Sequence, residues 1–272
     1  MYNLLISLII LIVLIIYNLY IFKEDFTNKN KNKNKNIKIG IIIPVTSNKR
    51  NYKNITEIDF FKIVLPSFLK NCAYKKYRHN FYLGYDDDDK FFLENKTKIK
   101  EYFNKITKKY NSDIKLYKIK DKKGKVGEIW SILAQNAVND NCEYLYQIGD
   151  DIEFKTSNWE HKFINKLKET NNVGVVGPTD INNTKLLTQS FVHKTHLEIF
   201  NTFYPPIIEN WYIDDWISDV YKPNNYYMFN NINVNNKGGP PRYTINKTIK
   251  KDLDKLVQNS KEQLHKYLIN NK

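Results

Sequence analysis

The sequence is poor in cysteine and in arginine, and both shortages limit what the protein is. Its 272 residues include two cysteines, Cys72 and Cys142, too few for a small secreted domain built on disulfides and without the spacing of a zinc site. Arginine occurs only at Arg50, Arg78 and Arg242, although the formal net charge is +14. Clustered basic residues interleaved with aromatics would signal nucleic-acid binding, and the lysines here are spread thinly. We therefore predict neither a structural zinc site nor a nucleic-acid partner.

Lysine and asparagine are the residues in excess. An AT-rich genome encodes many lysines and asparagines at solvated surface positions. We therefore do not treat the positive charge as a functional signal. Hydrophobic residues make up 42% of the chain. The part after residue 36, about 235 residues, is large enough to bury a core. An intrinsically disordered chain is excluded.

Residues 4–22 form a candidate transmembrane anchor. They carry no charged side chain over a length that matches a hydrocarbon core of about 30 Å. A cleaved signal peptide is the alternative, although it would have a shorter apolar stretch that follows basic residues. Residues 23–36 have a polar, low-complexity composition, which predicts a tether between the membrane and the domain. The protein is thus predicted to cross the membrane once, but the side of the membrane that its domain faces is left open. Lysines after the span favour a cytosolic domain, and four glycosylation sequons favour a lumenal one.

Residues 37–272 alternate between strand and helix patterns. Apolar runs predict strands near 37–45, 80–85, 114–119 and 143–148, and helical spacing occurs near 59–71, 96–110 and 126–138. Pro66 is expected to kink or interrupt the first helix. An apolar stripe at 247–270 predicts a terminal helix packed on the domain. This alternation indicates a mainly parallel sheet covered by helices, in which ligands bind beyond the carboxyl ends of the strands.

Acidic residues gather at these predicted strand ends. Asp150 and Asp151 directly follow the strand near 143–148, and two adjacent carboxylates repel each other unless a cation joins them. Their hard oxygen atoms suit Mg²⁺ or Mn²⁺ together with a substrate diphosphate; a solvated turn is the alternative. Residues 86–89 form a second acidic loop. One or two of its carboxylates are expected to face inward, and Asp86 is the best candidate to bind a nucleoside base or ribose, with a structural role as the alternative.

Taken in order, these motifs resemble those of GT-A type glycosyltransferases. Four segments occur in the same order as in the family. They are the first strand with IIIPVTS, the second strand running into acidic residues, the loop and helix KKGKVGEIWSILAQNAV, and the strand ending in Gly149-Asp150-Asp151. The segments GVVGPTD, LLTQSFVHKTHLEIF and NWYIDDWISDVY also resemble membrane-anchored glycosyltransferase-like proteins of protists, algae and large DNA viruses. The resemblance covers roughly residues 37–243. It implies a GT-A (Rossmann-like) α/β fold, with a mainly parallel sheet flanked by helices after one N-terminal transmembrane helix.

The resemblance implies roles at the donor end of the site. The family holds a divalent metal and the sugar nucleotide with a D-x-D or E-D-D element. Carried over, Asp151 would bind the metal and Asp150 would lie near the ribose or donor sugar. The sequence departs from the pattern at Gly149, where a first acidic residue is often found. The other residues that would hold the nucleotide or its phosphates are Pro44, Thr46, Asp86 and Lys125, of which the last has a plain surface lysine as its alternative.

Segment 210–221, NWYIDDWISDVY, combines aromatic residues with Asp214 and Asp215. Sugars stack on aromatic rings and hydrogen-bond to carboxylates, so this composition is typical of an acceptor site. In inverting members of the family an acidic residue here removes the acceptor proton, a role the resemblance gives to Asp215 with Asp214 in reserve; helix capping is the alternative. His193 and His196, predicted on one helix face, are candidates to complete the metal shell, with packed or surface histidines as the alternative.

We therefore predict a metal-dependent glycosyltransferase that moves a sugar from a nucleotide-sugar donor to a hydroxyl of a glycan or protein. Three alternatives stay open. One is a noncatalytic glycan-binding or virion-surface protein with a decayed GT-A site. A sugar-phosphate nucleotidyltransferase is the second, although its usual glycine- and arginine-rich first loop is absent. A metal-dependent phosphohydrolase is the third, from which more histidine ligands are expected. The donor sugar, the acceptor and the oligomeric state are left open.

Overall fold

The computed structural model of the chain describes residues 37–238, 244 and 247–271. Within these ranges no helix is both long and apolar enough to cross a membrane. The span predicted at 4–22 and the tether predicted at 23–36 lie outside the described residues and stay predictions. The domain described here begins with the first strand, at Ile37.

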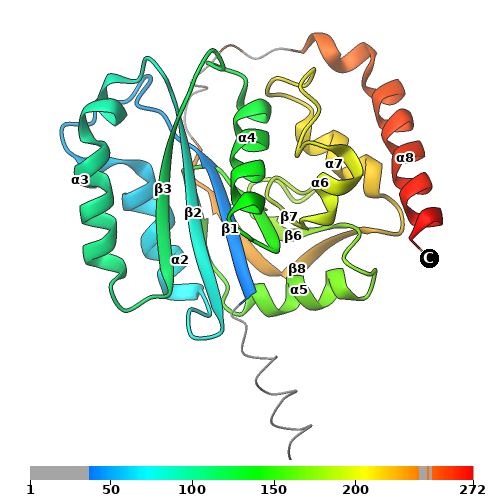
Figure 1. Cartoon of the computed structure of the whole chain (residues 1–272), viewed down its shortest axis with the longest axis horizontal. Helices are drawn as coiled ribbons and strands as arrows, with labels where there is room; N and C mark the ends of the chain where they lie inside the picture. Colours follow the sequence, from blue (N-terminus) through cyan, green and yellow to red (C-terminus); the bar gives the residue numbers. More distant parts are fainter. Residues whose placement is uncertain (1–36, 239–243, 245–246, 272) are drawn as a thin grey trace, which may run out of the picture. The chain divides into compact units, whose positions relative to one another are not determined.

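Eight strands of the described residues form one sheet in the order β3-β2-β1-β4-β7-β6-β8-β5 (Figure 1). They are β1 (Ile37–Pro44), β2 (Tyr77–Asp86), β3 (Ser112–Ile119), β4 (Tyr144–Gln147), β5 (Ile152–Phe154), β6 (Val175–Asp180), β7 (Ser190–His193) and β8 (Tyr226–Asn236). The pairs β1/β4, β2/β3 and β6/β8 are parallel. The pairs β4/β7, β6/β7 and β5/β8 are antiparallel. The sheet is therefore mixed.

This mixed sheet corrects the prediction of a mainly parallel one. The four strands predicted from apolar runs are all present, and among them the pairs β1/β4 and β2/β3 are parallel. The difference arises at β7, which runs antiparallel to both its neighbours, and at β5, which runs antiparallel to β8. Residues 181–189 alone connect β6 to β7, and a parallel connection needs a crossover of about a dozen residues or more.

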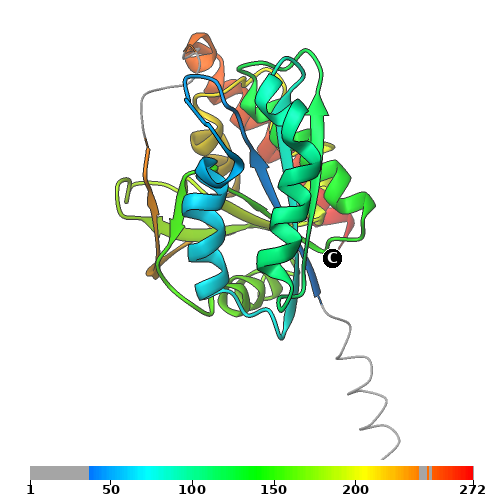
Figure 2. The same cartoon turned by 90° about the vertical axis from the view of Figure 1, so that its left-hand side faces the viewer.

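Helices cover both faces of the sheet. The helices are α2 (Leu65–Asn71), α3 (Lys90–Thr107), α4 (Val126–Asn139), α5 (Trp159–Lys168), α6 (Thr195–Phe200), α7 (Ile213–Tyr221) and α8 (Leu253–Asn270), with a π-helical segment at Phe60–Val64 and 3-10 turns at Ile55–Glu57 and Thr248–Lys251. Figure 2 shows α2 and α3 near each other on one side of the domain. The rings of Phe61, in the π-helical segment, and Tyr102, on α3, lie 5.0 Å apart.

The helix predicted at residues 59–71 changes its hydrogen-bonding pattern at Pro66. The π-helical segment leads directly into α2, and Pro66 falls in the first turn of that helix. Proline is tolerated there because the first backbone N–H groups of an α-helix have no intrahelical acceptor. Pro66 therefore marks a change of helix type and does not end the helix.

The central strands send alternate side chains into two hydrophobic layers. Tyr82 and Leu145 pack in the cluster that contains α4, α6, α7 and α8. The neighbouring residues Phe81 and Tyr146 face the other layer, where the ring of Tyr146 lies 5.0 Å from that of Trp159 on α5. Strands buried on both faces read as continuous apolar runs, which explains why the sequence pattern located them.

The predicted terminal helix is confirmed as α8, preceded by a 3-10 turn. Its inner side buries Leu264, and Ser260 accepts a 3.2 Å hydrogen bond from the indole nitrogen of Trp216 on α7. This helix thus packs against α6 and α7 (Figure 1) and supports the segment that carries Asp214 and Asp215.

Candidate active site

A cavity of about 240 Å³ opens where β1, β2 and β4 end and α4 begins. We call it the first cavity. Its wall includes five residues that the sequence analysis proposed for the nucleotide and metal: Pro44, Thr46, Asp86, Asp150 and Asp151. The three aspartates are 3%, 2% and 9% exposed, respectively. Residues from three separate stretches thus converge at one sheet edge, as expected for ligand sites in α/β sheets.

The loop after β1 is fixed by a carboxylate that the sequence analysis did not single out. Asp89 accepts hydrogen bonds from the backbone nitrogen and the hydroxyl of Ser47, both at 2.7 Å, and from the Thr46 hydroxyl at 3.4 Å. The same side chain caps α3 through the backbone nitrogen of Phe92 at 3.2 Å. Asp89 is 7% exposed. Two aspartates of the 86–89 loop therefore face inward, while Asp88 is exposed and pairs with a surface lysine.

Gly149 leaves the space that the Asp151 carboxylate fills. A Cβ atom at position 149 would lie 2.9 Å from Oδ1 of Asp151, closer than non-bonded carbon and oxygen atoms pack. Any side chain at this position, including an acidic one, would displace Asp151. The departure from the family's acidic pattern is thus coupled to the position of the remaining carboxylate.

The amino end of α4 forms another part of the wall of the first cavity. Gly124 and Val126 line it on either side of Lys125. Lys125 itself is absent from this wall, and its amine lies 3.7 Å from Glu128 and 3.5 Å from Glu209. The structure therefore brings the helix terminus to the cavity and directs the predicted lysine towards two carboxylates beside it.

A second cavity of about 400 Å³ adjoins the first. Both are lined by Val126, Trp130 and Gly149, so α4 and the end of β4 form a shared wall. Asp214 and Asp215, in the first turn of α7, also line the second cavity. The structure thus brings the predicted acceptor carboxylates next to the predicted donor site.

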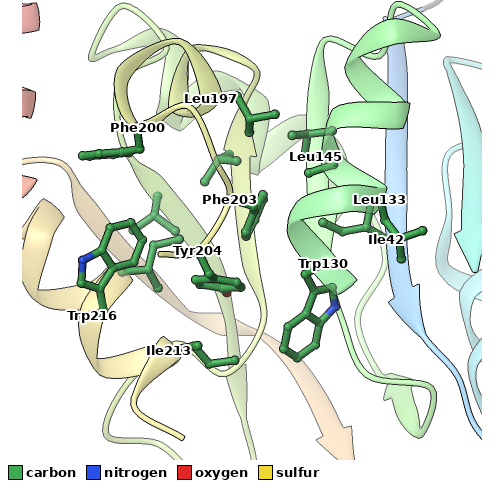
Figure 3. Packing of buried hydrophobic residues seen from close by; sticks show 14 of the residues in the cluster. Ile42, Trp130, Leu133, Leu145, Leu197, Phe200, Phe203, Tyr204, Ile213 and Trp216 are labelled. Atoms are coloured by element: carbon green, nitrogen blue, oxygen red, sulfur yellow. The ribbon is translucent and has the colours of Figure 1, made fainter. Parts of the chain in front are cut away.

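Aromatic packing fixes the position of α4, which lines both cavities, relative to α7, which carries Asp214 and Asp215. The ring of Tyr204 lies 5.8 Å from Trp130 and 6.2 Å from Trp216, and Figure 3 shows it between these two indoles. The Trp130 indole nitrogen also donates to the carbonyl of Ile148 at 3.2 Å. Because large interlocked rings leave these side chains little room to move, the core fixes how the two cavities lie relative to each other.

Asp214 is held in a protonated form near neutral pH. Burial, followed by the negative charges of Asp215 and Asp180, raises the pKa of Asp214 to about 8. The aspartate pair at the start of α7 therefore does not carry two full negative charges at pH 7. Carboxyl groups with strongly raised pKa values are typical of catalytic sites.

Asp180 is a second residue that the sequence analysis did not single out. This buried carboxylate accepts from the backbone nitrogen of Asn182 at 3.0 Å, the Thr188 hydroxyl at 3.2 Å and the backbone nitrogen of Asn236 at 3.3 Å. It thereby ties the 181–189 connection, which lines the second cavity, to the end of β8. Its position as the last residue of β6, at the end of GVVGPTD, was the available signal.

The two histidines lie away from both cavities. His193 ends β7 and His196 lies on α6, so the prediction that they share one helix face is wrong. His196 is buried, with its ring nitrogens 2.8 Å from the Tyr221 hydroxyl and 2.8 Å from the Phe203 carbonyl. Burial lowers the pKa of each histidine to about 4. Neither lines a cavity with Asp151.

The donor set of the first cavity suits a hard cation shared with a phosphate. Among the described residues, no three His, Cys, Asp or Glu side chains are close enough together to hold a metal by themselves. Mg²⁺ is commonly bound by one or two carboxylates, with substrate phosphates and water completing its shell. Asp150 and Asp151 meet that requirement. Glu153 faces Lys155 and Lys237, which lower its pKa to about 2.

Searches for relatives of the chain find similarity only in structure. No protein-family model matches the sequence, and no curated protein matches it. The fold is GT-A-like, as the motif order predicted. TarS of S. aureus is similar in structure: the crystal structure of its fragment 1–349 in complex with UDP-GlcNAc matches with a TM-score of 0.56 and 10% identity, over 82% of this chain and 66% of that one.

A second TarS structure gives the same result. The fragment 1–349 in complex with UDP matches with a TM-score of 0.53 and 11% identity, over 82% of this chain and 65% of that one. The chain thus spans slightly less than two thirds of the length of this TarS fragment. At such low identity the likeness establishes the fold, and the activity has to be argued from the site.

Proposed function

We propose that this protein is a glycosyltransferase that moves a sugar from a nucleotide-sugar donor to a hydroxyl acceptor. The observation that carries the proposal is the shared wall of the two cavities at Val126, Trp130 and Gly149. One cavity has buried carboxylates at the strand ends, and the other has Asp214 and Asp215. A two-substrate transfer needs its reactants held side by side with water kept out.

The first cavity is proposed to bind the nucleotide and its diphosphate. The loop after β1, with Pro44 and Thr46, and Asp86 at the end of β2 would hold the nucleoside. The amino end of α4 faces the same space, and helix amino termini attract phosphate groups. Support comes from TarS, whose similar fold is crystallised in complex with UDP and with UDP-GlcNAc.

Asp151, with Asp150 beside it in the same cavity, is proposed as the residue that would hold a divalent cation, Mn²⁺ or Mg²⁺. Such an ion would offset the charge that develops on the leaving diphosphate. The residues of this chain would then have two tasks: Asp151 would hold the ion, and the loop held by Asp89 would keep the nucleotide in place. We propose no ligand role for His193 or His196.

Asp215 is proposed to accept the proton of the acceptor hydroxyl. Both carboxyl groups at the start of α7 line the second cavity, and the raised pKa of Asp214 means that it retains a proton near neutral pH. Asp215 is then the carboxylate of the pair that acts as the base. Asp214 limits the charge of the pair while the acceptor is bound.

The alternative of a decayed site rested on the missing acid at position 149. Because a Cβ atom there would lie 2.9 Å from Oδ1 of Asp151, glycine at this position is also consistent with a site in which the Asp151 side chain occupies that space. The phosphohydrolase alternative is not favoured, because no histidine is among the described residues that line the two cavities. The membrane anchor at residues 4–22 remains a proposal from the sequence alone.

The test is titration calorimetry on the purified full-length chain with UDP and GDP, in the presence and absence of Mn²⁺. We expect one nucleoside diphosphate to bind and its affinity to fall when EDTA removes the ion. Screening nucleotide sugars for metal-dependent turnover then identifies the donor. Release of pyrophosphate from a nucleoside triphosphate would instead indicate a nucleotidyltransferase, and failure of every nucleotide to bind would contradict the proposed function.

A further inference from the structure

The second cavity lacks cationic side chains. Among the described residues that line it there is no lysine and no arginine, in a chain that contains 43 of these residues. Five of its lining residues carry a carboxamide: Gln147, Asn183, Gln189, Asn210 and Asn236. Carboxamides both donate and accept hydrogen bonds without carrying charge. This lining matches a ligand rich in hydroxyl groups, and its described residues include no lysine or arginine that could pair with an anion.

Gln189 adds a buried hydrogen-bond acceptor that points to such a ligand. Its side chain is 1% exposed, and among the described residues its Oε1 has no hydrogen-bond partner. A buried polar atom without a partner is unfavourable unless a ligand or water satisfies it. A hydroxyl group can donate to this oxygen, whereas an ionised phosphate or carboxylate cannot.

Trp211 provides an apolar surface on the wall of the same cavity. Its side chain is 44% exposed, which is unusual for so large an aromatic residue. The Lys247 amine lies 4.7 Å from the ring centre, and Tyr212 meets the indole nearly edge-on at 6.4 Å. Asn210 donates to the carbonyl of Gly124, which lines the first cavity, at 3.1 Å. The indole therefore sits on a segment tied to the donor side of the site.

Negative charge lies around this cavity from two directions. Asp215 lines it beside Asp214, which retains its proton near neutral pH, and the buried Asp180 supports the 181–189 connection that forms another part of its wall. An anionic ligand entering here would meet like charges and find no described lysine or arginine in the lining. A neutral ligand has no such penalty.

We infer that the acceptor is an uncharged carbohydrate, with one ring stacked on Trp211 and a hydroxyl donated to Gln189. This inference rests on the proposed function, because it names the substrate class of the acceptor half of that site. It separates neutral glycans from acceptors that carry phosphate, sulfate or carboxylate groups.

The test measures carbohydrate binding to the full-length chain saturated with UDP and Mn²⁺. The probes are neutral trisaccharides of glucose, mannose, galactose and N-acetylglucosamine, and trigalacturonate as the anionic counterpart of the galactose probe. We expect a neutral trisaccharide to bind and trigalacturonate to bind at least about tenfold more weakly, by saturation-transfer NMR. Trp211→Ala should weaken neutral binding about tenfold and Trp211→Phe much less, since an aromatic face is retained.

A matched readout keeps the variants interpretable. Each variant must bind UDP as the unaltered chain does, because Trp211 is not in the wall of the first cavity. Equal binding of trigalacturonate and the galactose probe, or neutral binding that survives Trp211→Ala unchanged, overturns the inference. UDP binding with no trisaccharide bound also overturns it and leaves the proposed function standing. Failure of all nucleotides to bind overturns the proposed function.

Discussion

The two cavities share one wall but are built from different chemistry. The first collects Asp86, Asp150 and Asp151 at the ends of strands and faces the amino end of α4. The second is bounded by carboxamides, an exposed indole and the aspartate pair of α7. A cation with a diphosphate suits the first, and a neutral polyhydroxyl compound suits the second.

The difference also separates the two halves of the sheet. The first cavity lies at the ends of β1, β2 and β4, the part of the sheet that includes the parallel pair β1/β4. The second adds residues from the 181–189 connection, which leads into the antiparallel strand β7, and from the end of β8, which pairs antiparallel with β5. The parallel part thus supplies a ligand site typical of α/β sheets, and the antiparallel part supplies a second site beside it.

The largest effect is expected from Asp151→Asn, which would remove the proposed metal ligand from the first cavity only. Metal-dependent donor turnover should fall about a thousandfold, the order seen when a key electrostatic group is lost. Thermal stability should not fall, because the change removes one of two adjacent negative charges. Asp88→Asn is the control, since Asp88 is exposed and pairs with Lys123. Full activity in Asp151→Asn would contradict the assignment.

Asp215→Asn tests the second cavity alone. Transfer should fall about a hundredfold, as expected for loss of a general base, while the affinity for UDP with Mn²⁺ stays unchanged because Asp215 is not in the wall of the first cavity. Asp219→Asn, an exposed position on the same helix paired with Lys222, is the control. A loss of UDP affinity in Asp215→Asn would show that the two cavities are not separate in function.

Gly149→Asp places an acid where the family pattern often has one, on the wall that both cavities share. Because a Cβ here would lie 2.9 Å from the Asp151 carboxylate, we expect Asp151 to move and metal-dependent UDP affinity to fall about tenfold. Gly149→Ala is the matched control for bulk without charge and should show a similar loss. A gain of activity in Gly149→Asp alone would instead support the decayed-site interpretation.

The first cavity was more predictable than the second, for a physical reason. Pro44, Asp86 and Asp150 follow apolar runs in the sequence, and parallel strands bring their carboxyl ends to one edge. The sequence analysis proposed five residues for the nucleotide and Asp151 for the metal, and five of these six residues line one cavity. The exception is Lys125, whose long side chain reaches two glutamates instead; sequence spacing does not fix where a lysine amine lies.

The second cavity depends on contacts that a linear pattern does not show. Asp180 ends β6, and Gln189 is the last residue of the 181–189 connection, which leads into the antiparallel strand β7. The same strand explains the error over the histidines: β7 extends to His193, and the helix starts only at Thr195. Aromatic and acidic composition did locate the segment with Asp214 and Asp215, because that signal is local.

The smallest expected effect concerns the proton on Asp214. The pKa of this group is about 8 in the folded protein against an ordinary value of 3.8. Between these pH values the folded state retains a proton that the unfolded state releases, so the contribution to stability is full below about pH 4 and is lost as the pH rises through 8. Asp214→Asn removes this titration. The variant should therefore show a flatter dependence of the free energy of unfolding on pH.

At pH 8 the variant should be more stable than the unaltered chain by more than about 1.4 kcal/mol, the value of one pKa unit, and the two should converge near pH 4. Urea unfolding across pH 4–8 measures this, with Asp219→Asn as a control whose side chain is exposed. If Asp214→Asn also slows transfer without changing UDP affinity, the same side chain that lowers the stability of the folded protein at pH 8 also contributes to the function of the second cavity. Equal pH slopes for the two chains would show that Asp214 is ionised in the folded protein, and the choice of Asp215 over Asp214 as the base would then lose its support.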